Sequence, residues 1–374
     1  MVEKNIAILK GDGIGPEIMQ EAIKIIHITA EVFGHHFNYT CVPFGASAWK
    51  KENDVFPGKT KEICDVSDAI LKGPVGDSTI TKEIKDPTKS PEIGGILALR
   101  KRYDTYANYR PVILPKALYE SSPLRKEIIK QGVNILMMRE LVGGIYFGKK
   151  VEEDIDENGE KYALDECKYT ENQVTRIAKV AFEEAQKRNV QLTNIHKSNV
   201  LATSRFWNKI VDNISKEFPK VKVNSCLVDA AAFYLVKDPT RFNGVMLLEN
   251  MHGDILTDQG GGVLGSLGLM PSACINPSTK KGFYEPSHGS APDIAGKGIA
   301  NPYSQIGCVA MMFETGFDLE KEAKAIWNAL HSVFEQGYRT IEIATESTPK
   351  NKIVSTSKFG DLVVKNIIEA GASV

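Results

Sequence analysis

The segment Glu249-Asn-Met-His-Gly-Asp-Ile-Leu-Thr-Asp258 contains two carboxylates that lie four residues apart, at Asp254 and Asp258. The apolar run over residues 245–248 is typical of a buried strand, and a helix beginning near Gly253 would place both carboxylates on one face. Like charges at this spacing repel each other. A Mg²⁺ or Mn²⁺ ion reverses that cost because it prefers carboxylate oxygens. The segment therefore indicates either a divalent-metal site or two carboxylates that are stabilised by the dipole at the start of a helix.

Other polar side chains follow predicted strands, which is where α/β proteins place their sites. They form an acidic set, a basic set and a pair able to transfer protons: Asp229, Asp254 and Asp258; Arg100, Arg110 and Arg139; and Tyr146 and Lys197. Because a guanidinium binds a carboxylate through two parallel hydrogen bonds, the three sets together suit a substrate with two carboxylates. Each residue taken singly is also compatible with a surface charge, a core aromatic or a solvated lysine.

Alternating strands and helices must position these residues. Apolar runs predict strands at 6–9, 69–72, 105–114, 133–138, 190–195, 221–228 and 245–248. Apolar stripes predict helices at 16–30, 91–103, 170–188, 206–214, 230–235, 304–315, 319–334 and 359–370. This order predicts an α/β sheet with helices on both faces. The polar segment 149–168 has a turn signal at 156–159 and predicts a protruding hairpin or arm.

The composition narrows the class of protein. The 374 residues are 42% apolar and 25% charged, with a net charge of −1, which gives no reason to expect nucleic acid or a membrane surface as partner. The six cysteines are scattered without a C-x-x-C pair, as expected for thiols in a reducing compartment. No apolar run reaches transmembrane length, and no signal-peptide pattern opens the chain. We expect a cytoplasmic protein.

The loop after the first predicted strand has glycines at positions 11, 13 and 15, so it does not match the G-x-G-x-x-G dinucleotide fingerprint. No acidic residue ends a clear second strand about 20 residues further on. We therefore expect no Rossmann-type fingerprint here, although a tight turn that approaches a ligand remains possible.

Four long motifs, at residues 139–148, 196–201, 249–258 and 288–302, together resemble the β-decarboxylating dehydrogenases, the family of the isocitrate and isopropylmalate dehydrogenases. The resemblance covers nearly the whole chain. It implies a two-domain α/β fold with mixed sheets flanked by helices, which is not a Rossmann fold. The implied cofactor-binding domain joins 1–105 to 266–374, and 106–265 forms the substrate, metal and dimerisation domain with its arm at 149–168. A homodimer with an active site shared between subunits is implied.

The resemblance also implies a role for each residue. Asp229, Asp254 and Asp258 match the ligands of Mg²⁺ or Mn²⁺, with one or more from the partner subunit, and Asp229 also lies at the substrate. Arg100, Arg110 and Arg139 match the clamp on the malate moiety. Lys197 matches the base that accepts the hydroxyl proton, and Tyr146 the acid that protonates the enolate after CO₂ leaves. The cofactor loop is matched by His288, Gly289, Ser290, Ala291, Pro292, Asp293, Ile294, Ala300 and Asn301.

Three positions depart from the family pattern. His196 stands where Asp usually precedes the lysine, and His252 stands where Phe usually precedes Gly-Asp. Residues 259–262, Gln-Gly-Gly-Gly, replace a more acidic and less glycine-rich helix start. None removes a catalytic group, and His252 is either a spectator or an extra metal ligand. Non-catalytic regulatory subunits of this type tend to lose the lysine, the tyrosine or a ligand Asp, all of which this chain retains.

The cofactor predicted is NAD rather than NADP. Asp293 lies in the loop that faces the adenosine ribose in relatives, where a carboxylate accepts hydrogen bonds from ribose hydroxyls and repels a 2′-phosphate. NADP-using relatives place Lys and Tyr at this point, whereas this chain has Asp293-Ile294. An Asp that caps a turn after Pro292 is the structural alternative.

The substrate predicted is (2R,3S)-3-isopropylmalate, because Ile96 and Leu97 are apolar at the positions that face the C3 substituent in relatives. A buried γ-carboxylate without a partner there would cost several kcal/mol, whereas burying an isopropyl group gains about 1.5–3 kcal/mol. Isopropylmalate enzymes often carry Glu seven residues before the first arginine. That position is Ile93, with Glu92 one step earlier, so either an insertion in Gly94-Gly95 restores the register or the pocket is more apolar. Isocitrate, homoisocitrate, tartrate and D-malate are the alternative substrates.

Overall fold

The structure is a computed structural model that describes residues 1–372. One ten-stranded mixed sheet runs through the molecule in the order β2-β1-β3-β12-β11-β4-β5-β10-β8-β9. In that order the strands are His36–Val42, Glu3–Leu9, Ala69–Lys72, Gly282–Pro286, Pro271–Ile275, Ala107–Ile113, Asn134–Glu140, Gly244–Leu248, Leu192–His196 and Val223–Leu227. The predicted α/β class is confirmed.

The sheet has two halves that meet at a single antiparallel contact. Strands β2, β1, β3, β12 and β11 come from the two ends of the chain, and the other five come from its middle. The join between β11 and β4 has only three residue pairs, whereas β4 and β5 share seven. The predicted boundaries near 105 and 265 fall close to this join, and the division into domains stays a prediction.

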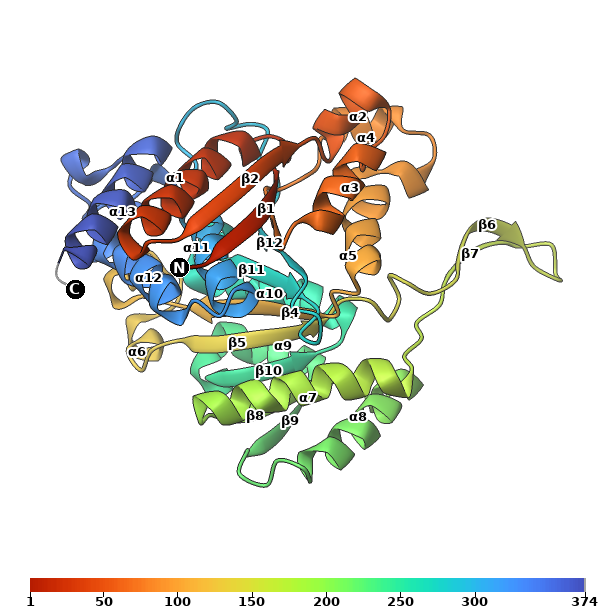
Figure 1. Cartoon of the computed structure of the whole chain (residues 1–374). Helices are drawn as coiled ribbons and strands as arrows, with labels where there is room; N and C mark the ends of the chain where they lie inside the picture. Colours follow the sequence, from red (N-terminus) through yellow and green to blue (C-terminus); the bar gives the residue numbers. More distant parts are fainter. Residues whose placement is uncertain (373–374) are drawn as a thin grey trace.

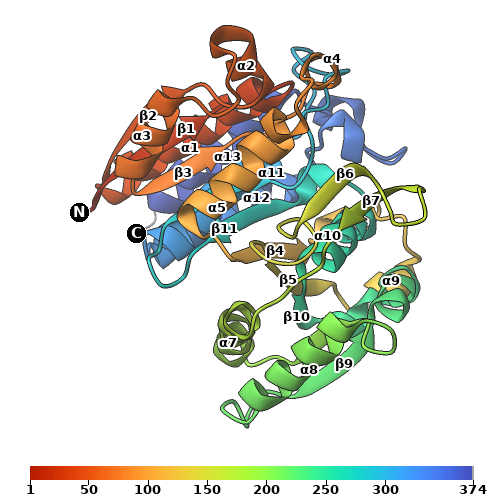
Figure 2. The same cartoon turned by 90° about the vertical axis from the view of Figure 1, so that its right-hand side faces the viewer.

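Helices cover both faces of the sheet (Figures 1 and 2). Helices α1 (Gly15–Phe33), α11 (Tyr303–Met311), α12 (Glu320–Glu335) and α13 (Thr356–Gly371) pack together beside the half that holds the termini. Helix α7 (Glu171–Arg188) packs on β5 and β10, with α8 (Ala202–Ser215) beside it. Helix α10 (Asn250–Leu264) contacts β4 and β5, and α9 (Val228–Lys237) contacts α10. The remaining α-helices are α2 (Ala46–Glu52), α3 (Gly58–Val66), α4 (Ser78–Glu83), α5 (Ala98–Tyr103) and α6 (Lys126–Ile129).

Local signals explain where these helices begin and end. Pro16 occupies the first turn of α1, and Gly34 ends it in the left-handed conformation at φ 69°. Thr170 and Gln173 form a capping box at the start of α7, since each side chain accepts from the other residue's backbone N–H. No helix among residues 1–372 is long and apolar enough to cross a membrane.

The predicted arm is a two-stranded hairpin, β6 (Lys150–Ile155) and β7 (Lys161–Asp165), that projects away from the body of the molecule (Figure 1). Its turn occupies the predicted residues, with Gly159 at φ 81°. Every residue of β7 is exposed, and Ile155, Tyr162 and Leu164 present apolar surface to solvent. An isolated hairpin of this kind needs a partner surface to be stable.

Two element boundaries differ from those expected. Helix α10 begins at Asn250 rather than near Gly253, because the side chain of Glu249 caps it by accepting from the N–H of His252 at 2.6 Å. The glycines at 260–262 therefore lie inside α10 and not at a helix start. A Cβ at Gly260 would lie too close to the buried side chain of Val112, and a Cβ at Gly261 would displace the side chain of Leu267.

Candidate active site

A cavity of about 380 Å³ lies between the two halves of the sheet, beside the predicted residues. Eight of them line it together: Ile96, Leu97, Arg100, Arg110, Tyr146, Asp254, His288 and Gly289. The cavity also contains Lys72, Pro74, Val75, Glu92, Glu285, Pro286 and Ser287. Residues from 72 to 289 in the sequence therefore converge on one space, although the cavity itself could not be read from the sequence.

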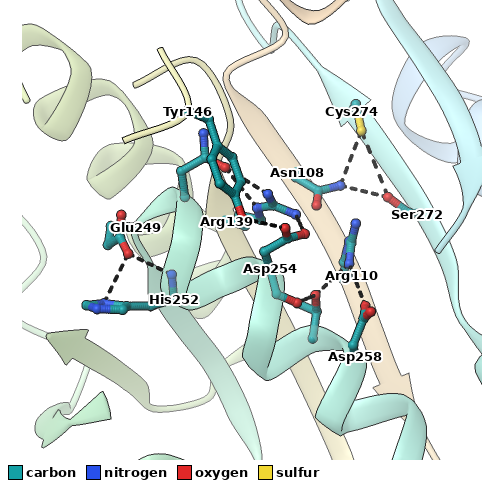
Figure 3. A network of polar contacts seen from close by, with 12 residues as sticks. Asn108, Arg110, Arg139, Tyr146, Glu249, His252, Asp254, Asp258, Ser272 and Cys274 are labelled. Carbon is teal, nitrogen blue, oxygen red and sulfur yellow. Dashed lines mark hydrogen bonds and ion pairs between the residues drawn. The ribbon is translucent and has the colours of Figure 1, made fainter. Parts of the chain in front are cut away.

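Two buried arginines, Arg100 and Arg110, line this cavity, and the buried Arg139 interacts electrostatically with both. Figure 3 shows Arg110 and Arg139 beside the two aspartates. Arg139 donates to Asp254 Oδ1 at 2.5 Å and to Asn250 Oδ1 at 2.8 Å, while Arg110 donates to Thr257 Oγ1 at 2.5 Å. Burial, together with the charges of Arg100 and Arg110, lowers the pKa of Arg139 to about 10, although the charge of Asp254 opposes the shift. This cluster calls for an anion, since like charges in a desolvated site destabilise one another.

Arg100 is the least satisfied of the three arginines. Its side chain is buried, its Nε has no hydrogen-bond partner, and no hydrogen bond or ion pair joins its guanidinium to any described residue. An unpaired buried charge is strongly unfavourable, so such a group points to an anionic ligand that is bound during function. Arg100 lies on α5, one turn after Ile96 and Leu97, which places the apolar pair next to it in the same cavity.

The helical segment that carries these residues is locally wound as a π-helix over Pro91–Leu97 before α5 continues it. A π-turn accommodates one extra residue, and such turns are frequent at functional sites. Within this segment, a Cβ at Gly94 would meet the backbone oxygen of Thr88. Glu92 lines the same cavity as Leu97, and the insertion alternative stays a prediction.

Asp254 and Asp258 lie on one face of α10, as predicted (Figure 3). Asp254 accepts from Arg139 and Tyr146, and although burial raises its pKa, the charge of Arg139 and the tyrosine hydrogen bond together lower it. The pKa of Asp258 is raised by burial, and the Asp254 charge adds to this while Arg110 opposes it. Asp258 makes only one long contact, 3.4 Å from Arg110, so its carboxylate keeps lone pairs that suit a hard cation.

Tyr146 and Lys197 do not meet within the described chain. The phenol of Tyr146 donates to Asp254 Oδ2 at 2.7 Å, and burial together with that bond raises its pKa to about 12. Lys197 follows β8 and its Nζ lies 2.7 Å from Asp229 Oδ1, at the first turn of α9. This pairing lowers the pKa of Asp229. Neither residue of the Lys197–Asp229 pair lines the cavity.

The predicted metal ligands are therefore split between two places. Among residues 1–372, no group of three His, Cys, Asp or Glu side chains is arranged so that it could hold a metal ion. Asp254 and Asp258 lie beside the arginines, while Asp229 lies with Lys197. One chain therefore contributes two separate parts of the predicted site, and neither part is complete among the described residues.

The predicted cofactor loop packs against the glycine loop after β1. The N–H of Ile14 donates to the Ser290 carbonyl at 2.8 Å, and Ser290 Oγ donates to the Gly76 carbonyl at 2.6 Å. Gly13 has φ 55°, and a Cβ there would overlap Ser290, so the tight turn expected at this loop is required by the packing. Asp293 is exposed, and the buried Asn301 Nδ2 has no partner, which leaves it free to bind a polar group.

Two features were missed by sequence reasoning. Lys72 is fully buried in the cavity wall and lies 2.5 Å from Glu285. Asp12 is buried in the glycine loop and accepts from three backbone N–H groups, those of Ala46, Ser47 and Gly76. Lys72 ends β3 and Asp12 follows β1, so the position of a polar residue at a strand end could have indicated both. Many solvated polar residues have the same position, so it does not single these two out.

The two unusual histidines have structural partners. The ring of His252 points away from Asp254 in Figure 3, and its Nδ1 lies 3.2 Å from Glu249 Oε1. His196 Nε2 lies 2.6 Å from Ser225 Oγ. Both rings line a separate cavity of about 160 Å³ beside Trp207 and Tyr169. This geometry favours the spectator interpretation of His252.

Comparison with known proteins agrees with the fold and identifies the family. The isocitrate/isopropylmalate dehydrogenase family model matches residues 5–363. The 3-isopropylmalate dehydrogenase of Carboxydothermus hydrogenoformans is 43% identical over 97% of this chain and 94% of its own length. That of Aquifex aeolicus is 42% identical over 98% of each chain. The isocitrate dehydrogenase structure from Methylococcus capsulatus has a TM-score of 0.83 at 30% identity, covering 97% of this chain and 99% of its own. The fold and site define a β-decarboxylating dehydrogenase. The chain belongs to the isocitrate/isopropylmalate dehydrogenase family.

Proposed function

We propose that this protein catalyses the NAD-dependent oxidative decarboxylation of (2R,3S)-3-isopropylmalate to 4-methyl-2-oxopentanoate and CO₂, a step of leucine biosynthesis. One observation carries the proposal: Arg100 is a buried guanidinium without a protein partner, and it lines one cavity with Arg110, Ile96 and Leu97. That cavity has cationic groups for carboxylates and an apolar wall for a branched alkyl group. Relatives 41–43% identical over 97–98% of the chain carry the matching name.

The lining of the cavity supports isopropylmalate over isocitrate. Both substrates share the malate moiety that the arginines would bind, so the C3 substituent decides between them. Ile96 and Leu97 offer that group an apolar contact. Lys72 lines the same cavity, but it is held by Glu285 at 2.5 Å and is therefore not free to neutralise an additional substrate carboxylate.

A divalent cation would be held by Asp254 and Asp258 together with Asp229 of a second chain, and NAD⁺ would lie along His288–Ile294, Ala300 and Asn301. Bound there, the cation would supply polarisation of the substrate hydroxyl, and the nicotinamide would supply the hydride acceptor. The arginines orient the carboxylates, and Lys197 accepts the hydroxyl proton. Loss of CO₂ from the β-keto acid leaves an enolate. Tyr146 donates its phenolic proton to the enolate carbon, which suits a group whose high pKa keeps it protonated at neutral pH.

A homodimer would unite the two parts of the site. Lys197 and Asp229 lie together on one part of the chain, and Tyr146 and Asp254 lie on another. Large apolar side chains are exposed on the elements around Lys197, Asp229 and α10, which is unusual for a monomer surface. They are Val200, Leu201, Phe206, Val223, Phe233, Val236 and Ile255. A second copy of this chain would cover them, and the β6–β7 arm would pair with its counterpart.

We propose that the cofactor is NAD⁺ and that the protein works in the cytoplasm. Asp293 is exposed in the loop that packs on the start of α1, so it is available to ribose hydroxyls. A 2′-phosphate at this position would be repelled by the carboxylate. Comparable kcat/KM for NAD⁺ and NADP⁺ would contradict this part of the proposal.

A substrate panel tests the function directly. Purified protein with Mn²⁺ and NAD⁺ is assayed with isopropylmalate, isocitrate, homoisocitrate, tartrate and D-malate. We expect the highest kcat/KM for isopropylmalate. A higher kcat/KM for any other member would refute the substrate assignment, and no turnover with any of them would favour a non-catalytic ligand-binding role.

A further inference from the structure

A second cavity, of about 410 Å³, lies behind the substrate cavity on the opposite face of the sheet. Strand β4 lies between the two cavities. Successive residues of a strand point to opposite faces of the sheet, so neighbouring residues of β4 line different cavities. Arg110 lines the substrate cavity, whereas its neighbours Tyr109 and Pro111 line the second one. No residue lines both. We call the second space the rear cavity.

The rear cavity is built from both halves of the sheet. Its walls come from β4, β5 and α7 on one side and from β11, α11 and α12 on the other. Its interior is aromatic and apolar, with Tyr109, Tyr303 and Trp327 beside Leu136 and Met311. A cavity of this size and lining is in the range of small-molecule sites.

The charges at the rim of the rear cavity are paired with one exception. Arg188 lies 2.9 Å from Glu184, Lys187 lies 3.3 Å from Glu320, and Lys280 is paired with Asp318. These pairs leave no cation free to bind an anionic ligand without breaking an existing contact.

Glu314 is the exception. It lies in the π-helical turn Met312–Gly316 after α11 and lines the rear cavity half-buried. No hydrogen bond or ion pair joins its carboxylate to another described residue. Burial raises its pKa although the charges of Lys187 and Arg188 oppose this. A partly desolvated carboxylate without a donor is stabilised by a ligand that supplies one.

We propose that the rear cavity is a second ligand-binding site, which takes a small molecule with an apolar or aromatic body and an ammonium group. The ammonium group would pair with Glu314. The body would contact Trp327 and the two tyrosines, where aromatic faces also attract a cation. Free amines and apolar amino acids both have an ammonium group and an apolar body. The amino acids differ from the free amines because they also carry a carboxylate. The inference does not depend on the substrate of the front cavity.

The test measures binding to the full-length protein by isothermal titration calorimetry with three probes of similar shape. Phenethylammonium has the ammonium group alone, L-phenylalanine has both charges, and 3-phenylpropionate has the carboxylate alone. We expect phenethylammonium to bind and 3-phenylpropionate not to bind. Binding of phenylalanine as tight as that of the amine would identify amino acids as the source, and weaker binding would identify free amines. Absence of binding by both ammonium probes, or equal binding of 3-phenylpropionate, would overturn the proposal.

Three variants locate the bound probe. Glu314→Gln should weaken phenethylammonium binding about tenfold or more, because it removes a charged hydrogen-bond partner. Glu346→Gln is the matched control, since Glu346 is exposed and outside the cavity, and it should leave binding unchanged. Ile113→Trp fills the cavity from a half-exposed position and should abolish binding. Unchanged binding in both Glu314→Gln and Ile113→Trp would overturn the proposal.

Discussion

The phenol of Tyr146 donates a 2.7 Å hydrogen bond to Oδ2 of Asp254, whose Oδ1 accepts from the buried Arg139. The proposed proton donor and a proposed metal ligand are thus joined in one polar network (Figure 3). A single carboxylate holds both the tyrosine and the arginine in place. The network explains how a tyrosine with a raised pKa stays oriented towards the cavity.

Replacing Tyr146 with Phe tests the proton-donor role. The ring and its packing remain, so the KM for isopropylmalate and the metal affinity should change little. The kcat should fall by about 10²–10⁴-fold, because the group that protonates the enolate is lost. Steady-state kinetics with NAD⁺ and Mn²⁺ give both constants, and an unchanged kcat would refute the role.

Co-expression of two inactive variants tests the shared active site. Tyr146→Phe and Lys197→Ala chains carrying different tags are purified as a heterodimer. If each site takes Tyr146 from one chain and Lys197 from the other, one site in the heterodimer is intact. We expect about half of the wild-type activity, because a two-fold symmetric dimer has two equivalent sites. Each variant homodimer serves as control and should be nearly inactive. An inactive heterodimer would instead place both residues in a site formed by a single chain.

Shortening Leu97 tests the apolar wall. Leu97→Ala removes contact with the C3 substituent and should lower kcat/KM for isopropylmalate about tenfold to a hundredfold. D-malate lacks the isopropyl group, so its kcat/KM should change much less and provides the control. Equal losses for the two substrates would mean that Leu97 acts through packing of the π-helical segment and not through the substrate.

Glu140 should make stability depend on pH. Burial raises its pKa to about 7 from an ordinary 4.5, although the N–H groups of Val142 and Gly143 donate to its oxygens and oppose the shift. The folded protein therefore binds this proton more tightly than the unfolded chain. The resulting stabilisation is fully present below about pH 4.5 and is lost as the pH rises through about 7.

Glu140→Gln removes the titration and keeps an acceptor for one of the two N–H groups. The cost of the lost acceptor does not vary with pH, so it cancels when the variant is compared with the wild type at several pH values. The difference in free energy of unfolding between the variant and the wild type should move in favour of the variant by a few kcal/mol between pH 4.5 and 8. Urea unfolding at several pH values measures it. A difference that does not change with pH would show that Glu140 keeps an ordinary pKa in the folded protein.

Much of the architecture follows from local patterns in the chain. Apolar runs predicted seven of the ten strands of the main sheet and missed β2, β11 and β12. Caps such as Thr170 with Gln173 define where helices begin. The four-residue spacing of Asp254 and Asp258 is enough to place them on one helical face, because helix geometry alone determines it. The start of α10 was misplaced because Glu249 acts as a cap, a role that Ser, Thr, Asp and Asn fill more often.

Other properties depend on contacts between segments far apart in the sequence, and only the tertiary structure decided them. The residue types could not show that Arg100 lacks a partner, because that depends on which carboxylates the fold brings near it. The pairing of Lys72 with Glu285 joins positions more than 200 residues apart. Glu92, in the π-helical segment, lines the cavity together with residues as distant in sequence as Asp254 and Glu285. The spacing of residues thus determines which of them share an element, whereas long-range packing determines which charges are neutralised and which stay available for a ligand.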